Sequence, residues 1–463
     1  MPSRSKLARL AVIAAAVVVV PLAVARADDA AASDDQPKSF WEQDQMLGDL
    51  GGLRTLLDGA GVTFSLQEQS ELIGNLTGGL RTGAVYDGAT LGMVTVDMDK
   101  AVGIPGGKFY VSAYQIHGRS PTENLVGSLQ TVTSIDATRA TRLYNLYYEQ
   151  LFFGDALSVR LGQFAADDEF ILNTYGALFI NSTFGFPALP AIDLPAGGPA
   201  YPLTTPGIRF RVRPTDALSL YAALFNGDPA PNGVGNPQIL NNSGTTFRTN
   251  GGAFVISEAQ YAINQGDKAT GLPGTYKIGA WINTNKFADT RDDRTGESLA
   301  SPTSGGVPLQ HQNDWSIYAT FDQLVWRREG TKDQGIGVFG RVMGAPSDRN
   351  ASNFYANGGL NWKAPIASRP DDSAGLGFGY VAISPRVMAF DRDIAFFTGQ
   401  PFPIANREVL FEATYQYQAA GWLQIQPDAQ YIINPGGHVP NPVVPGQVIK
   451  NAFILGVRAT VQF

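Results

Sequence analysis

The chain has 463 residues, 44% of them hydrophobic, with 52 glycines, 26 phenylalanines, 17 tyrosines and no cysteine. The missing cysteines exclude a disulfide framework, a thiolate zinc site and a cysteine nucleophile, and the net charge of −7 argues against nucleic acid as a partner. This length suits two to three soluble domains or one large barrel, and the glycines and aromatics suit many strands and turns.

The first 27 residues have the pattern of a secretory signal. Arg4, Lys6 and Arg9 precede an apolar run at 10–24, and A-R-A at 25–27 predicts cleavage after Ala27. The apolar run is shorter than the roughly 20 residues that a spanning helix needs. The segment carries four basic and no acidic residues, so the mature chain has 34 − 4 = 30 basic and 41 acidic residues, a net charge of −11.

The next segment, 28–61, is predicted to be a flexible leader followed by a short periplasmic helix. Residues 28–39 are small and polar, rich in Asp and Ala. Leu50, Leu53, Leu56 and Leu57 then recur at helical spacing, and a glycine at 59 suits a helix end. An amphipathic surface helix is sufficient to explain this pattern.

From residue 62 onward the chain alternates between apolar and polar side chains, which predicts β-strands. In 62–74, Val62, Phe64 and Leu66 share one face, and polar residues occupy the other. The alternation predicts an all-β fold with an even number of strands, sixteen, as a closed bacterial barrel requires. The expected strands are 62–74, 88–98, 107–118, 141–151, 156–163, 207–213, 217–225, 252–263, 275–285, 314–326, 335–343, 354–363, 375–383, 407–418, 421–433 and 451–463.

The strand at 207–213 reads G-I-R-F-R-V-R, with Arg209, Arg211 and Arg213 at every second position. One face is therefore cationic and the other apolar. Taken alone, this pattern fits a half-buried strand of a soluble sheet better than a membrane strand. In a membrane barrel the arginines would face the lumen, because an arginine on the lipid face costs about 2–4 kcal/mol at the bilayer midplane.

The connections between the expected strands alternate in length. With both chain ends in the periplasm, the tight segments 152–155, 214–216 and 419–420 are inner turns. The long segments 118–140, 164–206, 226–251 and 286–313 are outer loops. Short inner turns and long outer loops are typical of transmembrane antiparallel barrels of the outer membrane. A soluble protein of several sheets has no reason for this parity.

The final strand is the longest regular alternation. Phe453, Leu455, Val457, Val461 and Phe463 lie on one face of 451–463. Closure of such a barrel satisfies the backbone groups that lipid cannot. A last strand that ends in Phe463 resembles the signal by which the outer-membrane assembly machinery recognises barrel precursors.

Several runs resemble the carbohydrate-selective porins of the OprB family in the family's order. They are L-G-D-L-G-G-L-R-T-L-L-D-G-A-G at 47–61, N-L-T-G-G at 75–79, L-G-Q-F-A-A-D-D-E-F at 161–170, L-F-I-N at 178–181 and Q-P-D-A-Q-Y-I-I-N-P-G-G at 426–437. The resemblance covers nearly the whole mature chain. It implies a sixteen-stranded outer-membrane barrel at 62–463 that passes sugars into the periplasm.

The segment 164–206 is too long for a plain turn, and its aromatics argue against disorder. We expect it to fold into the lumen as a constriction loop; an extracellular cap with solvated acids is the alternative. The lumen carries both charge signs and amides, which favours a neutral solute over an anion. The candidate constriction residues are Arg160, Arg209, Arg211, Asp167, Asp168, Glu169, Phe179, Asn181, Glu412, Asp428 and Gln430.

Three further patterns have simpler explanations. Gly335, Gly337 and Gly340 fit a dinucleotide motif, but no helix is expected after them, so no cofactor is predicted. Asp292 and Asp293 lack the spaced ligands of a calcium loop, and no metal is predicted. Four tryptophans are expected in the aromatic girdles at the membrane interfaces: Trp281, Trp315, Trp326 and Trp422.

The sequence therefore predicts an outer-membrane porin through which monosaccharides such as glucose diffuse, without a chemical step. Its partners would be sugars, outer-membrane lipids and the assembly machinery, and it would act as a monomer or homotrimer. A general, weakly selective porin is the first alternative. A barrel-scaffold enzyme is less favoured, because His117, His311 and His438 lie far apart and lack an evident Ser partner. A plugged receptor would need more than the residues of 28–61.

Overall fold

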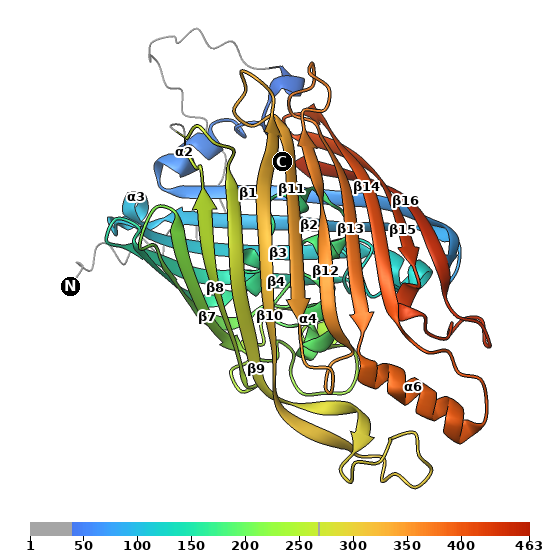
Figure 1. The fold of residues 1–463 in the computed structure, drawn as a ribbon. Helices are drawn as coiled ribbons and strands as arrows, with labels where there is room; N and C mark the ends of the chain where they lie inside the picture. The colour runs from blue at the N-terminus through green and yellow to red at the C-terminus, as the bar shows by residue number, and fades with distance from the viewer. Residues whose placement is uncertain (1–38, 267–268) are drawn as a thin grey trace, which may run out of the picture.

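A computed structural model describes residues 39–266 and 269–463. In these ranges sixteen antiparallel strands form a closed barrel, in which β1 pairs with both β2 and β16 (Figure 1). The strands are β1 (Val62–Gly79), β2 (Gly83–Asp97), β3 (Gly107–Gly118), β4 (Ala140–Phe152), β5 (Leu157–Phe164), β6 (Thr205–Val212), β7 (Leu218–Asn226), β8 (Ala253–Ile263), β9 (Gly274–Asp293), β10 (Pro308–Arg327), β11 (Gly335–Gly344), β12 (Ser352–Lys363), β13 (Ser373–Ile383), β14 (Arg407–Ala420), β15 (Leu423–Ile433) and β16 (Lys450–Gln462). The predicted barrel and its strand number are confirmed. The predicted signal and most of the leader lie outside the described residues.

The helical segments of the described chain are short. They are η1 (Phe40–Glu42), α2 (Leu53–Gly59), α3 (Met98–Val102), η2 (Thr122–Val126), η3 (Ala166–Asp168), η4 (Tyr175–Leu178), η5 (Ser182–Phe184), α4 (Ala188–Asp193), η6 (Pro195–Gly197), α5 (Pro237–Leu240), α6 (Pro385–Thr398) and η7 (Pro435–Gly437). Within 39–266 and 269–463 no helix has the length and apolarity needed to cross a membrane.

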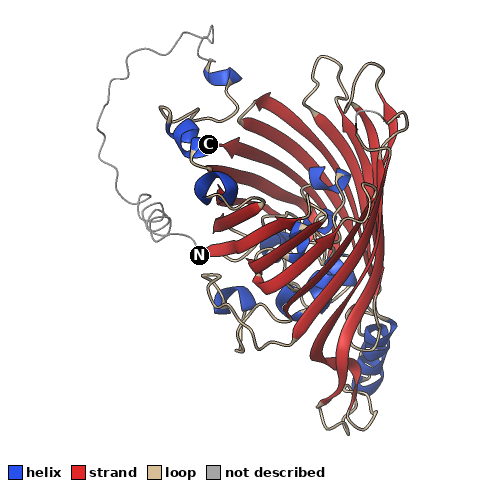
Figure 2. Cartoon of the chain, turned by 90° about the vertical axis from the view of Figure 1, so that its left-hand side faces the viewer, coloured by secondary structure: helices blue, strands red, loops and turns tan. Residues whose placement is uncertain are grey.

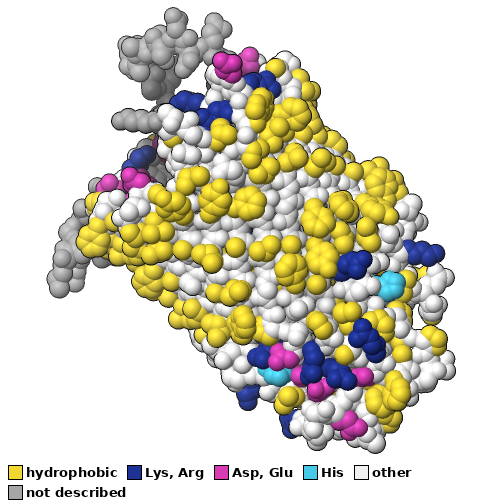
Figure 3. Space-filling view, viewed as in Figure 1, with side chains coloured by type: hydrophobic (Ala, Val, Ile, Leu, Met, Phe, Trp, Pro, Cys, Tyr) yellow, Lys and Arg dark blue, Asp and Glu magenta, His cyan; other side chains and the backbone are white. Residues whose placement is uncertain are grey.

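The alternation of side chains fixes which face of each strand meets lipid. Ile278, Ile317 and Leu376 are 57–67% exposed on the outside of the barrel, whereas Arg209 and Glu412 on the opposite face are 0% and 2% exposed. Figure 3 shows hydrophobic side chains spread over the outer surface of the strands in view, with charged side chains gathered toward the two ends. The inward orientation predicted for the polar face is therefore what the barrel shows.

The inner turns and outer loops follow the predicted parity with two exceptions. The connections 80–82, after β1, and 345–351, after β11, are short although each follows an odd-numbered strand. A larger difference concerns β9 and β10, which run for 20 residues each and form a long hairpin beyond the barrel. The polar residues from 284 to 293 have the composition of a loop. A hairpin in water needs no apolar face, because paired backbone groups and polar side chains suffice.

The N-terminal segment closes the seam between the first and last strands. Arg54, on the predicted short helix α2, donates to the backbone carbonyls of Phe463 at 2.7 Å and Phe64 at 3.0 Å. Trp41 stacks on Trp422 in the β14–β15 turn, with ring centroids 5.4 Å apart. We call this end of the barrel the periplasmic end and the other the outer end.

Two apolar clusters fill much of the lumen. One contains Phe164, Phe225, Phe254 and Trp281, and the other forms around Phe339. The expectation that Trp281 belongs to an interface girdle is wrong, because it occupies an inward position of β9 and is 2% exposed. Both clusters combine inward side chains of the strands with loop residues such as Phe170 and Phe184, so loops narrow the lumen.

Candidate functional site

The connection between β5 and β6, residues 165–204, runs inside the barrel. Figure 2 shows its short helices enclosed by the strands. Three of its backbone N–H groups donate to carboxylates on inward positions of β8, β10 and β14. The pairs are Ile171 N with Glu258 Oε2 at 2.8 Å, Tyr175 N with Asp322 Oδ1 at 2.9 Å and Ile180 N with Glu412 Oε1 at 2.6 Å. The loop therefore crosses the lumen instead of capping it from outside.

Arg341 on β11 fixes the middle of this crossing loop. Its guanidinium donates to the carbonyls of Phe184 at 3.0 Å and Gly185 at 3.1 Å, and to Asn173 Oδ1 at 3.1 Å. Arg341 is 2% exposed. A buried guanidinium is tolerated only with such hydrogen bonds, so the loop and Arg341 stabilise each other.

Where the loop leaves β5, two arginines and two glutamates form a charge cluster. Glu149, Arg160 and Arg209 are direct cross-strand neighbours on β4, β5 and β6. Arg209 contacts Glu169 of the loop at 2.6 Å and Glu149 at 2.7 Å, and Arg160 contacts the same two carboxylates at 3.4 and 3.3 Å. Two positive and two negative charges thus compensate one another away from bulk water.

The edge of this cluster is open to solvent. Lys108 lies 3.1 Å from Glu149, and its side chain is 42% exposed. Asp168 lies 4.0 Å from Arg160, and its side chain is 26% exposed. The Arg209 side chain, in contrast, is 0% exposed. A solute in the channel can reach Lys108 and Asp168, whereas Arg209 is enclosed.

Stacked tyrosines line the wall beside the cluster. The rings of Tyr110 on β3 and Tyr147 on β4 stack with centroids 5.0 Å apart. The Arg160 guanidinium lies over the Tyr147 ring, 4.2 Å from its centroid. Tyr110 is partly exposed. The wall therefore offers an aromatic face next to charged donors and acceptors.

Arg211 stands apart from Arg209, although both face inward. It pairs with Asp155 in the β4–β5 turn, and Arg213 reaches the same carboxylate at 2.8 Å. Arg211 and Lys108 line a cavity of about 590 Å³ at the periplasmic end, within the range of about 300–1,000 Å³ usual for small-ligand sites.

The remaining predicted strand residues gather around β14 and β15. Asn181 donates from its backbone to Glu412 at 3.2 Å and from Nδ2 to Gln430 Oε1 at 3.0 Å, and Gln430 donates to Asp428 at 2.9 Å. All four residues are 6% exposed or less. They bind the crossing loop to the wall.

Two further predicted residues sit within the loop's own packing. Phe179 contacts the ring of Phe184 with centroids 4.5 Å apart and is 4% exposed. Asp167 accepts from the backbone of Tyr201 at 3.2 Å. Burial, with the charge of neighbouring Asp168, raises the pKa of Asp167 to about 7.

The eleven predicted residues thus fall into separate groups and not into one ring. Arg209, Phe179, Asn181, Glu412 and Gln430 are 4% exposed or less, so their contacts are with the loop and not with solute. The alternation of side chains predicted the inward face of the strand residues Arg209, Glu412 and Gln430 correctly. It could not reveal which of them would contact the loop and which the solute.

Sequence reasoning missed a second inward loop, residues 119–139. Its backbone N–H groups at Leu129 and Gln130 donate to Glu408 at 2.7 and 2.8 Å. Thr133 donates to Glu71 at 2.9 Å. The signal for these anchors was present, because the alternation of β1 and β14 places Glu71 and Glu408 on the inward faces of these strands.

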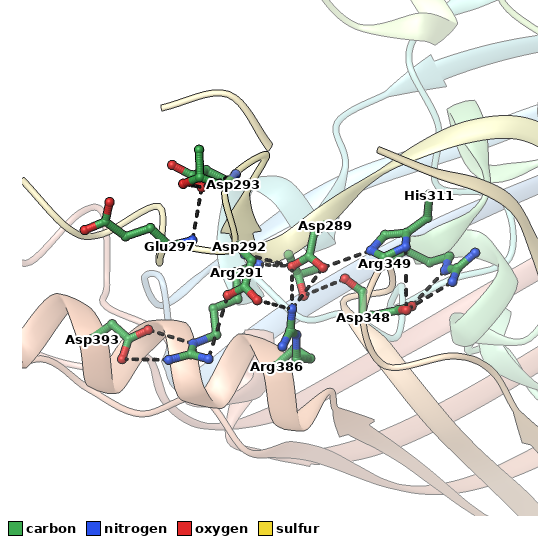
Figure 4. A network of polar contacts seen from close by, with 12 residues as sticks. Asp289, Arg291, Asp292, Asp293, Glu297, His311, Asp348, Arg349, Arg386 and Asp393 are labelled. Atoms are coloured by element: carbon green, nitrogen blue, oxygen red, sulfur yellow. Dashed lines mark hydrogen bonds and ion pairs between the residues drawn. The ribbon is translucent and has the colours of Figure 1, made fainter. Parts of the chain in front are cut away.

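Charged side chains also tie together the outer end. Figure 4 shows Asp289 of β9 between His311 of β10 and Arg386 of α6, at 2.8 and 3.0 Å. Arg291 reaches Asp393 of α6 at 2.7 Å. This network holds α6 against the long β9–β10 hairpin.

The part of the chain that the structure describes contains no group of three or more His, Cys, Asp or Glu side chains that could hold a metal ion.

Comparison with known proteins gives concordant matches. The family model described as "Carbohydrate-selective porin, OprB family" matches residues 81–463. Porin B of Pseudomonas aeruginosa is 27% identical over 443 residues, covering 91% of this chain and 93% of the relative. The putative porin QuiX of Acinetobacter baylyi is 25% identical over 433 residues, covering 86% and 90%.

A solved structure matches over the same length. The high-pH structure of Pseudomonas putida OprB aligns with a TM-score of 0.80 and 25% identity, covering 92% of this chain and 100% of that one. The low-pH structure of the same protein aligns with a TM-score of 0.55 and 19% identity. The chain belongs to the OprB family of carbohydrate-selective porins, and it is a carbohydrate porin of the bacterial outer membrane.

Proposed function

We propose that this porin passes monosaccharides such as glucose, and that the solute is selected where it passes the charge cluster of β4–β6. The observation that carries the proposal is the periplasmic-end cavity, lined by Lys108, Glu149, Asp155 and Arg211. Tyr110 and Tyr147 stack on the wall next to it.

The chemistry of this wall suits a sugar. A sugar hydroxyl both donates and accepts, so a cation and a carboxylate side by side can each replace water at the same hydroxyl pair. The apolar C–H face of a pyranose needs a flat partner, which a partly exposed tyrosine ring supplies. Such contacts are weak enough one by one for the solute to leave again.

We assign the buried residues a positioning role. Arg209, Asn181, Glu412 and Gln430 hold the crossing loop, whose position sets the width of the path. Asp168, Glu169, Arg160 and Arg211 remain candidates for solute contact, because their side chains are 8–26% exposed. Asp167, Phe179 and Asp428 support the loop.

The chain is a channel, and we propose that it performs no chemical step. His311 is paired with Asp289 in the outer hairpin, and His117 contacts Glu68. His311 thus lies in the hairpin beyond the barrel and His117 on the outward face of β3, so neither faces a solute in the lumen. One barrel carries all the residues assigned above, so a monomer suffices for passage, and a homotrimer would repeat the same path. We also propose that the outer-membrane assembly machinery recognises Phe463 before Arg54 binds its carbonyl.

The test is single-channel conductance of the folded mature chain in a planar bilayer, titrated with glucose and then with an amino acid of similar size. We expect saturable block by glucose alone. Equal effects of both solutes would leave a general, weakly selective porin and remove the monosaccharide assignment. A folded barrel without conductance would favour the receptor or enzyme alternatives.

A further inference from the structure

A second polar cavity lies at the outer end of the barrel. It measures about 520 Å³ and is bounded by the beginning and end of the loop 119–139 and by the segment around α5. Arg119 and Arg139 both line it, and both are exposed. Among the described residues, neither guanidinium has an ion-pair or hydrogen-bond partner. Nearly every other arginine discussed above is paired, so these two charges are available to a ligand.

The walls of this outer cavity are fixed by hydrogen bonds between two loops. Thr138 donates its backbone N–H to Gln238 Oε1 at 2.7 Å, and Asn236 Nδ2 donates to Thr138 Oγ1 at 3.2 Å. Ser120 donates to Asp136 at 2.9 Å on the other side. Preformed walls lower the entropy that a ligand must lose on binding.

Two acids limit which anion the cavity can hold. Glu123 and Asp136 also line it. Burial raises the pKa of Asp136 and so favours its neutral form, while its hydrogen bonds to Thr122 and Ser120 act in the opposite direction. The Asp136 carboxyl accepts from Ser120 Oγ and from the backbone N–H of Thr122, so it is already engaged by the wall of the cavity. A singly charged carboxylate is matched by one bidentate guanidinium, whereas a phosphate dianion meets more repulsion from Glu123.

The rest of the lining suits hydroxyls. Ser120, Asn124, Thr131 and Gln238 supply donors and acceptors of both kinds. We propose that the outer cavity is a binding subsite for carboxylated sugars, with Arg119 and Arg139 holding the carboxylate and the amide and hydroxyl side chains holding the polyol. This inference rests on the proposed function, and it adds sugar acids to the substrate class of the porin.

The experiment compares D-gluconate with glucose as blockers of single-channel current, each added to the outer side and then to the periplasmic side. The variant is Arg119→Gln combined with Arg139→Gln. The control is Arg294→Gln, which removes the same charge from an exposed residue of the β9–β10 loop. We expect gluconate to bind from the outer side, and the double variant to weaken this binding by roughly tenfold or more, as the loss of charge-assisted hydrogen bonds predicts. The control should leave it unchanged.

Binding is also measured apart from transport, by equilibrium dialysis of gluconate against the purified barrel in detergent. If gluconate binds no better than glucose, or if the double variant binds it equally well, the subsite proposal is overturned while block by glucose still upholds the proposed function. Tighter binding of inorganic phosphate than of gluconate would also overturn it, in favour of a phosphate site. If glucose gives no block but gluconate binds in dialysis, the monosaccharide assignment fails and the subsite stands.

Discussion

Arg209 Nε donates to Glu169 Oε2 at 2.6 Å, which joins β6 to the loop that crosses the barrel. Its Nη2 donates to Glu149 Oε1 on β4 at 2.7 Å. One guanidinium thus links two strands and the loop with fixed geometry. The position of the loop depends on the planar guanidinium donating in two directions, which the ammonium group of a lysine cannot reproduce.

Replacing Arg209 by lysine separates its geometry from its charge. Arg209→Lys keeps the positive charge but cannot serve both carboxylates, and weakening a buried pair in this way can cost up to about 3–5 kcal/mol. We expect a loosened loop, seen as higher single-channel conductance and weaker block by glucose, with the reversal potential nearly unchanged. Arg213→Lys is the control, because that side chain is 38% exposed and forms its ion pair with Asp155 in the β4–β5 turn. Wild-type conductance in Arg209→Lys would show that the contacts of Arg209 with Glu149 and Glu169 do not set the width of the channel.

Arg211 should affect the ion selectivity of the channel and not its width. It lines the periplasmic-end cavity, and its ion pair is with Asp155 of the β4–β5 turn instead of with the crossing loop. Arg211→Gln removes one positive charge from the path, so we expect the reversal potential in a salt gradient to shift toward cation selectivity, with conductance close to that of the wild type. A shift of equal size in Arg213→Gln would mean that the effect is not specific to the cavity.

Glu412 and Glu258 anchor different parts of the crossing loop. Glu412 accepts the N–H groups of Ile180 and Asn181, whereas Glu258 accepts that of Ile171. In Glu412→Gln the side-chain NH2 group cannot accept a hydrogen bond, so one of these backbone N–H groups loses its acceptor. An unpaired buried N–H costs about 1–3 kcal/mol. We expect faster amide hydrogen exchange at Ile180 and Asn181 and unchanged exchange at Ile171. Glu258→Gln should give the reverse pattern. Uniform acceleration in both variants would indicate that the loop opens as one unit.

Titration of the Asp168 carboxyl should make the ion selectivity of the channel depend on pH. Burial raises the pKa of Asp168 to about 6, opposed by Arg160. Below pH 6 the carboxyl is neutral, and above it the carboxylate adds a negative charge to the path. Cation selectivity should therefore increase as the pH rises from 5 to 7, and Asp168→Asn should reduce this step. Because the folded state binds these protons more tightly than the unfolded chain, the stability contributed by Asp167 and Asp168 falls as pH rises from about 4 to 7. A pH-independent reversal potential would exclude Asp168 from the path.

The barrel itself could be predicted from local patterns. The alternation of Arg209 with Ile208 and Phe210 gives the face of β6, because an arginine in lipid is expensive. Phe463 and the apolar face of β16 give the closing strand. Each of these signals depends on neighbours in sequence, which is why most strands could be located within about five residues, whereas the outer ends of β9 and β10 were missed.

The contacts inside the lumen could not be predicted in the same way. Glu412 and Ile180 are separated by 232 residues, and no local pattern indicates which loop meets which wall. The helix α6 was missed in the connection between β13 and β14, since its position depends on Arg291 and Asp393 meeting across two elements. The sequence therefore identified lumen-facing residues without telling anchors from solute contacts.

A cluster of polar side chains lies on the lipid face of β1–β3. Glu68 shares the outward face of β1 with Leu66 and Leu72, which are 40% and 56% exposed. Its carboxylate accepts from Thr90 at 2.5 Å and lies 3.4 Å from His117 Nε2. Polar groups facing lipid are tolerated when they satisfy one another, so these side chains should stabilise the barrel only as a set.

Removing one member should therefore cost more than removing both. Glu68→Leu leaves Thr90 and His117 without their carboxylate, and we expect the free energy of unfolding to fall by about 1–3 kcal/mol. Glu68→Leu combined with His117→Leu removes the two ion-pair partners together and should recover part of this loss, although Thr90 loses its acceptor and Tyr86 its contact with His117. Urea unfolding of the barrel in lipid vesicles measures the single and double variants as a cycle. Strictly additive losses would show that Glu68 and His117 act independently, and that each side chain tolerates the lipid face without the other.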